Sequence, residues 1–177
     1  MIDFKIIENF LDRDQFLNLQ KIFLSNNFPW FYHDNISGAN ESALGDFGFG
    51  HSILYGETKS SAYNIVEPIL NTVCTASETN QMLKVRADMT VFSVYGHRHQ
   101  PHLDLHAPHT VSILYLTNSD AETVIFKNID IEKNSFEEYK RIAPQENKLV
   151  VFNGSYYHTG HSPASTNRRI LLNFNSI

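Results

Sequence analysis

Hydrophobic residues follow a helical spacing in the first half of the chain. Apolar positions recur every three to four residues in two segments, which predicts amphipathic helices over about 13–26 and 60–76. Asp12, with Gln15 three residues later, resembles a capping box at the start of the first helix. The short apolar run at residues 2–7 reads as a strand that precedes it.

After residue 82 the pattern changes to short runs of β-branched and aromatic residues, separated by turn-like segments. The runs are LKVRADMTVFSVY, HTVSILYLT, ETVIFK, KLVVFN and RRILLNFN. Strands with this spacing are typical of a sandwich or barrel. We therefore predict a mostly β fold, in which a jelly-roll-like core over 81–177 carries the chemistry and residues 1–80 provide helical support.

No repeat, low-complexity tract or linker divides the 177 residues, so we expect a single domain over 1–177. The segment 37–50 contains four of the eight glycines and is predicted to be a loop. Because it also contains Phe47 and Phe49, it could act as a lid over a site. An ordinary surface connection explains the same composition equally well.

Composition and charge narrow the classes of function. A net charge of −5 with no basic run disfavours a nucleic-acid partner. No apolar stretch approaches the roughly 20 residues of a membrane span, and the N-terminus does not resemble a signal peptide. The single cysteine, Cys74, excludes an internal disulfide, and its apolar neighbours suggest a buried thiol. We expect a cytoplasmic protein; the sequence does not indicate an oligomeric state.

The most informative polar motif is His102-Leu103-Asp104. In an extended strand side chains alternate, so residues two apart project from the same face. A third ligand from elsewhere in the chain, such as His158, would complete a set of two histidines and one carboxylate. That set is the facial triad of non-haem Fe(II) oxygenases. Zinc would accept the same ligands, but open positions opposite them suit redox chemistry better.

Other readings of these histidines stay open. The chain has nine histidines, so an H-x-D pair arises easily by chance. His97 and His99 have strand spacing and could themselves form a chelating pair, as in metal-binding cupins. His161 lies three residues after His158 and could be the third ligand instead.

The order of motifs after residue 83 resembles that of the 2-oxoglutarate- and Fe(II)-dependent dioxygenases. The likeness is greatest to the small prolyl 4-hydroxylase-like members of bacteria and phages. It rests on His102-Leu103-Asp104, the apolar run 111–118, Asp120-Ala121-Glu122-Thr123-Val124-Ile125-Phe126, Pro144, the run 149–152, His158 and the closing strand from Arg169 to Phe174. The N-terminal half fits the family only loosely.

This resemblance implies a double-stranded β-helix with His102, Asp104 and His158 as Fe(II) ligands. Family spacing favours His158 over His161. It also implies that Arg169, in phase with Asn173, binds the far carboxylate of 2-oxoglutarate. Because adjacent strand residues face opposite ways, Arg168 is then a surface residue.

Two positions depart from the family pattern. Ala121 replaces the usual glycine of a turn, and Leu116 stands where many relatives have a tyrosine that contacts the co-substrate. We expect the adjacent Tyr115 to point to the other face. Tyr95, just before the ligand segment, could take that role instead.

The implied activity is hydroxylation of a C–H bond, with dioxygen and 2-oxoglutarate as co-substrates and ascorbate as a further cofactor. Analogy favours a peptidyl or free proline. Hydroxylation of another amino acid or small metabolite fits the same triad, and a non-oxygenase cupin-like metal-binding protein or a catalytically silent barrel remain alternatives. Trp30, Phe31 and Tyr32, with Phe47 and Phe49, could form an aromatic wall for a peptide, although such residues are more often core.

Overall fold

The computed structural model describes residues 2–37, 44–130 and 135–177. Those residues form two helices and eleven strands. In chain order the elements are β1 (Phe4–Ile7), α1 (Arg13–Phe23), β2 (Phe31–His33), β3 (Gly48–Tyr55), β4 (Thr58–Lys59), α2 (Tyr63–Ser77), β5 (Met82–Val91), β6 (Thr110–Tyr115), β7 (Thr123–Asp130), β8 (Ser135–Ile142), β9 (Leu149–Asn153), β10 (Tyr157–Thr159) and β11 (Arg168–Ser176).

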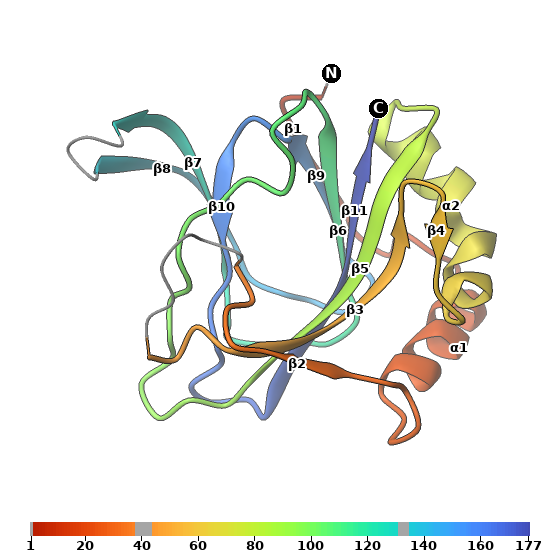
Figure 1. Cartoon of the computed structure of the whole chain (residues 1–177), viewed down its shortest axis with the longest axis horizontal. Coiled ribbons are helices and arrows are strands. Elements are labelled where there is room, and N and C mark those ends of the chain that lie inside the picture. The colour runs from red at the N-terminus through yellow and green to blue at the C-terminus, as the bar shows by residue number, and fades with distance from the viewer. Residues whose placement is uncertain (1, 38–43, 131–134) are drawn as a thin grey trace.

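The strands form two antiparallel sheets. The larger has the order β1-β9-β6-β11-β5-β3-β2, with β4 paired to β3, and the smaller has the order β10-β7-β8. Figure 1 shows both helices against one face of the larger sheet and the smaller sheet on its opposite side. This arrangement confirms the predicted mostly β fold with a double-stranded β-helix core.

Two apolar layers hold the sheets and helices together, one on each face of the larger sheet. Strand β11 contributes to both, because successive side chains point to opposite faces. Ile170 and Leu172 pack in the layer beneath the helices, together with Val66 and Val73 of α2. Leu171 packs in the layer between the two sheets. Burial of β11 on both faces explains why its sequence is an almost continuous apolar run.

Most predicted elements occur close to their expected positions. Both helices are shorter than predicted at one end, and the Asp12 carboxylate caps α1 by accepting a 2.9 Å hydrogen bond from the Gln15 N–H. Strands β2, β3, β4, β8 and β10 were not predicted. Strand β3 begins within the glycine-rich segment that was read as a loop. The other four are short, or they carry many exposed residues, so they lack the apolar alternation that reveals a half-buried strand.

Some predictions for the first half of the chain were wrong. The expected loop over 37–50 is not a loop at 48–50, where β3 begins; residues 38–43 of that segment lie outside the described residues. Strands β1 to β3 belong to the larger sheet, so residues 1–80 contribute more than helices. Cys74 is half-buried, because it lies beside the buried stripe of α2 and not within it.

Within the described ranges, neither helix is long and apolar enough to cross a bilayer.

Candidate metal centre and its cavity

A backbone pairing brings His102 and His158 together. The N–H of each donates a 3.0 Å hydrogen bond to the carbonyl of the other, as in an antiparallel pair. Both imidazoles therefore project from the same side, with ring centroids 4.6 Å apart. The expected strand over 102–104 is absent: only His102 is paired, and the chain beyond it is irregular. The turn of that irregular segment still directs Asp104 to the two rings.

The three side chains leave a gap that suits a metal ion. The Nε2 of His158 lies 3.6 Å from Oδ2 of Asp104, and the Nε2 of His102 lies 4.0 Å from Oδ1. Both distances are too long for a hydrogen bond, because polar side-chain atoms about 3.6 Å or more apart no longer form one. They are below about 4.2 Å, the greatest separation of two ligands with bonds of about 2.1 Å to one ion. The two imidazoles and the carboxylate are therefore spaced to bind a metal ion and not to form hydrogen bonds with one another.

Backbone carbonyls fix the tautomers of both histidines. Nδ1 of His102 lies 3.1 Å from the carbonyl oxygen of Gln100, and Nδ1 of His158 lies 3.4 Å from that of Tyr156. A carbonyl can only accept, so Nδ1 carries the proton in each ring and Nε2 presents its lone pair toward Asp104. Burial lowers the pKa of His158 to about 4, which keeps the ring neutral at pH 7. A neutral imidazole is the form that binds a metal.

Two amides of β11 orient the carboxylate. The Asn173 side-chain NH2 donates to Oδ2 of Asp104 at 2.9 Å, and that of Asn175 donates to the same oxygen at 3.3 Å. Burial opposes ionisation of Asp104, but the electrostatic influence of His158, His102 and the cations of β5 outweighs it and holds the pKa of the carboxyl below its usual range. Asp104 is thus ionised and aimed at the gap.

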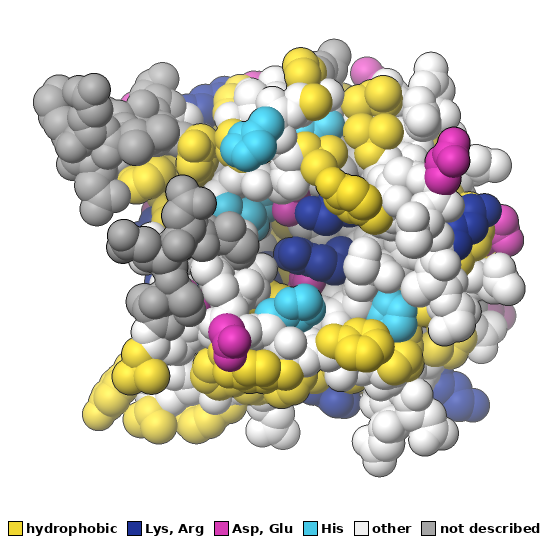
Figure 2. Space-filling view, viewed as in Figure 1, with side chains coloured by type: hydrophobic (Ala, Val, Ile, Leu, Met, Phe, Trp, Pro, Cys, Tyr) yellow, Lys and Arg dark blue, Asp and Glu magenta, His cyan; other side chains and the backbone are white. Residues whose placement is uncertain are grey.

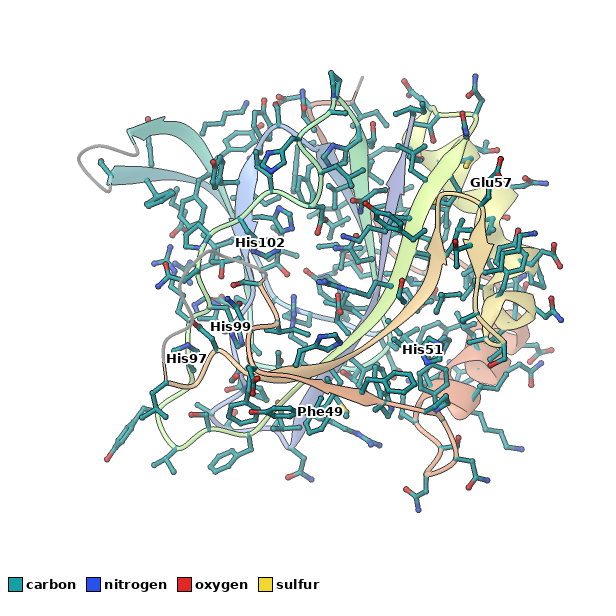
Figure 3. The ribbon with its side chains drawn as sticks, in the orientation of Figure 1. Phe49, His51, Glu57, His97, His99 and His102 are labelled. Carbon is teal, nitrogen blue, oxygen red and sulfur yellow. The ribbon has the colours of Figure 1, made fainter. Side chains whose placement is uncertain are left out.

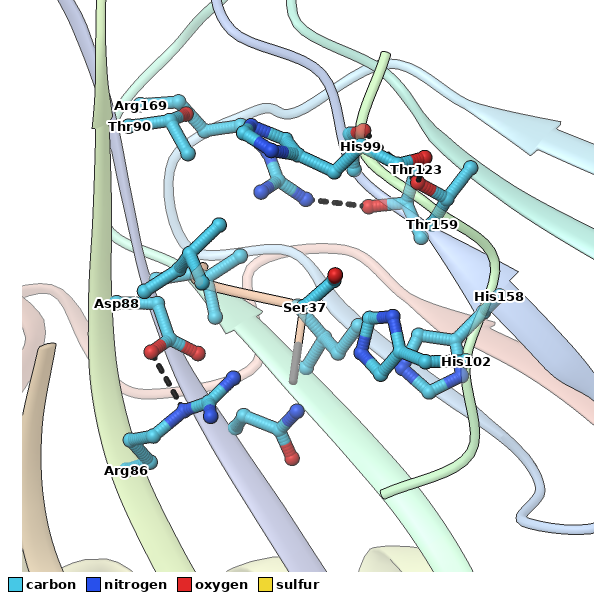
Figure 4. Close-up of a pocket in the computed structure, with 15 residues that line it drawn as sticks. Ser37, Arg86, Asp88, Thr90, His99, His102, Thr123, His158, Thr159 and Arg169 are labelled. Atoms are coloured by element: carbon cyan, nitrogen blue, oxygen red, sulfur yellow. Dashed lines mark hydrogen bonds and ion pairs between the residues drawn. The ribbon is translucent and has the colours of Figure 1, made fainter. Parts of the chain in front are cut away.

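Arg169 lies in the same cavity as the two histidines, buried at 6% exposure (Figure 4). Its Nη2 donates to Oγ1 of Thr123 at 2.6 Å, and its guanidinium carbon lies 5.6 Å from the centre of the Tyr115 ring. Within the described ranges no carboxylate forms an ion pair with it, and its Nε–H has no hydrogen-bond partner. A buried cation without a counterion favours an anionic ligand.

Close packing against Gly160 holds Arg169 in place. A Cβ at this glycine would lie 2.9 Å from Nη1 of the arginine. The position therefore accepts no side chain unless the guanidinium moves.

A second group of metal-ligand types lies near the cavity. Asp46, His97 and His99 also have donor atoms within 4.8 Å of one another, and Figure 3 shows His97 and His99 on the segment that leads to His102. Here, however, Nε2 of His97 contacts Oδ1 of Asp46 at 2.8 Å, a hydrogen-bond distance. His99 is also close enough to Arg169 for the guanidinium charge to act on it. These features make the His102–Asp104–His158 group the better cation site.

The structure separates the alternatives that the sequence left open. His158, and not His161, lies beside His102 and Asp104; His161 instead has Nδ1 2.8 Å from the carbonyl of Glu122. Arg169 faces the cavity, whereas Arg168 does not line it.

Both expectations about tyrosines were wrong. The side chain of Tyr95 is 93% exposed, so the structure does not bring it to the site. Tyr115 is fully buried and points into the space between the sheets, where its hydroxyl donates to Oγ1 of Thr123 at 2.6 Å. The strand phase is the reverse of that expected, because Leu116 faces the helices.

The proposed aromatic wall is not at the cavity. The residues that line the cavity include none of its five members. Phe31 and Tyr32 are more than half exposed, and Tyr32 packs against Phe47 and Phe49 at ring-centroid distances of 6.1 and 5.9 Å.

Several polar residues of the site were missed from the sequence. They are Arg86, Asp88 and Thr90 in the cavity wall, and Asn175 beside Asp104. A signal for the first three was available, because polar residues occupy alternate positions of the run Lys84-Val85-Arg86-Ala87-Asp88-Met89-Thr90. That alternation indicates a strand with one polar face.

Comparisons with known proteins identify the fold. No family model matches the sequence, and no curated protein matches it. The non-heme alpha ketoglutarate dependent epimerase SnoN from nogalamycin biosynthesis is similar with a TM-score of 0.68 at 7% identity, over 98% of this chain and 77% of that one. An oxidoreductase of the 2OG-Fe(II) oxygenase family from Burkholderia pseudomallei gives 0.67 at 12% identity, over 98% and 85%.

A prolyl-4-hydroxylase from Pseudomonas putida has a TM-score of 0.57 at 13% identity, over 98% of this chain and 91% of that one. The chain therefore has the fold of the 2OG-Fe(II) oxygenases over nearly its whole length. This confirms the fold that the order of motifs implied.

Proposed function

We propose that this protein is a 2-oxoglutarate- and Fe(II)-dependent dioxygenase that hydroxylates a C–H bond. The observation that carries the proposal is the convergence of His102, Asp104 and His158 beside a cavity. The two histidines line this cavity together with Arg169, a cation that no carboxylate of the described residues pairs with. The triad supplies ligands for Fe(II), and Arg169 supplies a charge partner for a dicarboxylate.

Each residue has a separate task in this proposal. His102 and His158 hold the metal through Nε2, because their Nδ1 atoms are directed to backbone carbonyls. Asp104 contributes the negative ligand and is kept in place by Asn173. Arg169 binds the far carboxylate of 2-oxoglutarate with its planar fork, and Thr123 and Tyr115 keep that fork in position.

When bound, Fe(II) supplies the redox chemistry that couples conversion of 2-oxoglutarate and dioxygen into succinate and CO2 to the insertion of one oxygen atom into a substrate C–H bond. The contribution of the protein is to position the reactants and to exclude water. The apolar layer between the sheets, which includes Ile113 and Leu171 in the cavity wall, serves the second purpose.

Succinate formation tests the proposal directly. With Fe(II), 2-oxoglutarate and dioxygen, the purified protein should release succinate, and Zn²⁺ in place of Fe(II) should not support the reaction. Asp104→Ala and His158→Ala should abolish turnover and metal binding, while His161→Ala should retain both. A wild-type protein that forms no succinate, or an Asp104→Ala variant that remains active, would overturn the proposal. Assays with and without ascorbate establish whether that reductant is required.

For the substrate we propose proline, either free or within a peptide, and a site of action in the cytoplasm. The sequence resemblance to prolyl 4-hydroxylase-like proteins and the structural likeness to the Pseudomonas putida enzyme support proline. A gain of one oxygen atom by a proline-containing probe, measured by mass spectrometry, tests this choice. Oxygenation of a different amino acid or metabolite alone would replace proline and leave the iron chemistry in place.

A further inference from the structure

The inner face of β5 carries a row of charged side chains beside the candidate metal centre. Lys84, Arg86 and Asp88 occupy alternate positions and so share one face, whereas Val85 and Ala87 pack in the layer beneath the helices. Arg86 and Asp88 line the same cavity as His102 and His158. Figure 4 shows both projecting from β5 into that space, and Figure 2 shows Lys or Arg side chains and histidines around a hollow near the middle of this face.

Asp88 holds the Arg86 guanidinium by one edge only. The Arg86 Nε lies 2.6 Å from Oδ1 of Asp88, and the two side chains are 23% and 10% exposed. This contact is an ion pair, and within the described residues neither Nε nor Oδ1 has another partner. No second carboxylate of the described chain pairs with Arg86. The remaining edge of the guanidinium is a planar fork that matches a carboxylate.

The charges of the proposed cofactors leave the Arg86–Asp88 pair available to a substrate. Arg169 and the net positive charge of Fe(II) with Asp104 balance the two negative charges of 2-oxoglutarate. Arg86 and Asp88 then remain in the cavity wall as one cation and one anion. Lys84 shares their face of β5 but does not line the cavity. Paired opposite charges in a cavity wall complement a substrate that carries both a carboxylate and an ammonium group.

We propose that Arg86 binds the α-carboxylate of a free amino acid and that Asp88 receives its ammonium group. The inference rests on the proposed oxygenase function and selects free amino acids over residues within a peptide, which carry neither charge. Fixing the charged end on β5 leaves the side chain of the amino acid free to extend across the shared cavity to the triad. Free proline has both of the required groups.

Amino acids and their amides form the probe pairs of the test. The wild-type protein, with Fe(II) and 2-oxoglutarate, is given L-proline and then each other proteinogenic amino acid, in parallel with the corresponding amide and with an N-acetylated proline amide. We expect at least one free amino acid to raise succinate release above background and to gain one oxygen atom, with its amide at least 10-fold less effective. Equal use of acid and amide, oxygenation of the acetylated amide alone, or no oxygenation of any free amino acid overturns the inference.

Variants then test whether Arg86 binds the substrate. Arg86→Met should raise the KM for the amino acid at least 10-fold while the KM for 2-oxoglutarate, whose far carboxylate Arg169 binds, changes less than threefold, and Arg86→Lys should recover part of the loss. Arg168→Met is the matched control, because Arg168 begins β11 but lies outside the cavity. If Arg86→Met leaves the KM for the amino acid unchanged, or raises both KM values equally, Arg86 has no specific role in substrate recognition.

These outcomes separate the inference from the function on which it rests. Substrate-free succinate release by a protein that ignores free amino acids removes the inference alone. A wild-type protein that never forms succinate removes the proposed function, and the inference with it.

Discussion

Single contacts decide which atom of each site residue faces the cavity. A backbone carbonyl two residues before each histidine holds its Nδ1, so both rings turn Nε2 to Asp104. Asn173 orients the Asp104 carboxylate in a similar way, by donating a hydrogen bond to its Oδ2. These partners are as important as the ligands, because they orient the donor atoms before a metal binds.

Removing the Asn173 amide should therefore weaken metal binding without removing a ligand. Loss of such an outer partner typically costs 10–100-fold in metal affinity, so we expect about that reduction for Asn173→Ala. Asn175→Ala should have a smaller effect, since its amide lies farther from Asp104, at 3.3 Å instead of 2.9 Å. Competition of the protein with a chelator for Co²⁺ measures both constants. Wild-type affinity in Asn173→Ala would show that Asp104 is oriented by other contacts.

The arginines of β11 allow a matched pair of substitutions. Arg169→Ala removes the buried charge partner of 2-oxoglutarate, and loss of such a partner costs roughly 2–5 kcal/mol. We expect at least a 30-fold rise in the 2-oxoglutarate concentration for half-maximal turnover, with Co²⁺ affinity unchanged. Arg168→Ala should leave both quantities as in the wild type. An unchanged requirement for 2-oxoglutarate in Arg169→Ala would exclude this role.

Secondary-structure elements bring these residues together through strand phase, which the sequence reveals only in part. Arg169 and Asn173 were placed correctly because they share a phase on a single strand. The phase of Tyr115 was misjudged, because it depends on which face of β6 the helices cover. The pairing of β6 with β9 and β11 in the larger sheet decides which face that is. The prediction for Tyr95 was wrong for a related reason. Its segment is irregular, so no alternation of side chains predicts the direction in which Tyr95 points.

The loop before β11 is another element that positions the site. The Asp120 carboxylate accepts hydrogen bonds from the N–H groups of Ala164, Ser165 and Thr166, at 2.8–3.0 Å, and from the Thr166 hydroxyl. This loop ends where β11 begins, just before Arg169. The carboxylate therefore determines where the strand enters the sheet.

Replacing Asp120 should lower stability in a pH-dependent way. Desolvation opposes ionisation of this carboxyl, but the hydrogen bonds from Thr166, Ala164 and Ser165 outweigh it and hold its pKa well below the ordinary 3.8. A lowered pKa in the folded state stabilises the fold above about pH 4, and the contribution is lost as the pH falls toward the folded value. Because Asp120 is exposed, we expect Asp120→Asn to cost only about 1 kcal/mol at pH 7.

Urea unfolding of wild type and Asp120→Asn at pH 7 and pH 3 measures the effect. The difference in the free energy of unfolding should be smaller at pH 3 than at pH 7. A difference that stays constant between the two pH values would show that the ionised carboxylate is not what stabilises the loop.

At the scale of the whole molecule, the site joins parts of the chain that the sequence could not place together. The family order of motifs was enough to pair His102 with His158 across 56 residues, and the structure explains the pairing by a backbone bridge. The contributions of Arg86 and Asp88 were not predicted, because both residues lie on β5, which precedes the first family motif, His102-Leu103-Asp104. The unpredicted strands β2 and β8 lie at sheet edges, where exposure removes the alternating pattern.

Binding of a metal and 2-oxoglutarate at the site should stabilise the whole folded chain. His158 belongs to β10 of the smaller sheet, whereas Asn173, which orients Asp104, belongs to β11 of the larger one. A metal and 2-oxoglutarate that bind here stabilise only the folded state, because the unfolded chain does not bring the ligands together. The stabilisation grows as RT ln(1 + [L]/Kd), or about 2.7 kcal/mol at 100 times Kd.

We therefore expect the Tm to rise by several degrees with saturating Co²⁺, since 1 kcal/mol corresponds to about 2–4 °C for a chain of this size. Addition of 2-oxoglutarate to the Co²⁺-bound protein should raise it further, and without metal it should have little effect. Arg169→Ala should keep the first increase and lose most of the second, whereas Asp104→Ala should lose both. Thermal melts of the three proteins distinguish these patterns. An equal rise in Asp104→Ala would place the stabilising metal elsewhere, and the Asp46–His97–His99 group would then be the first place to look.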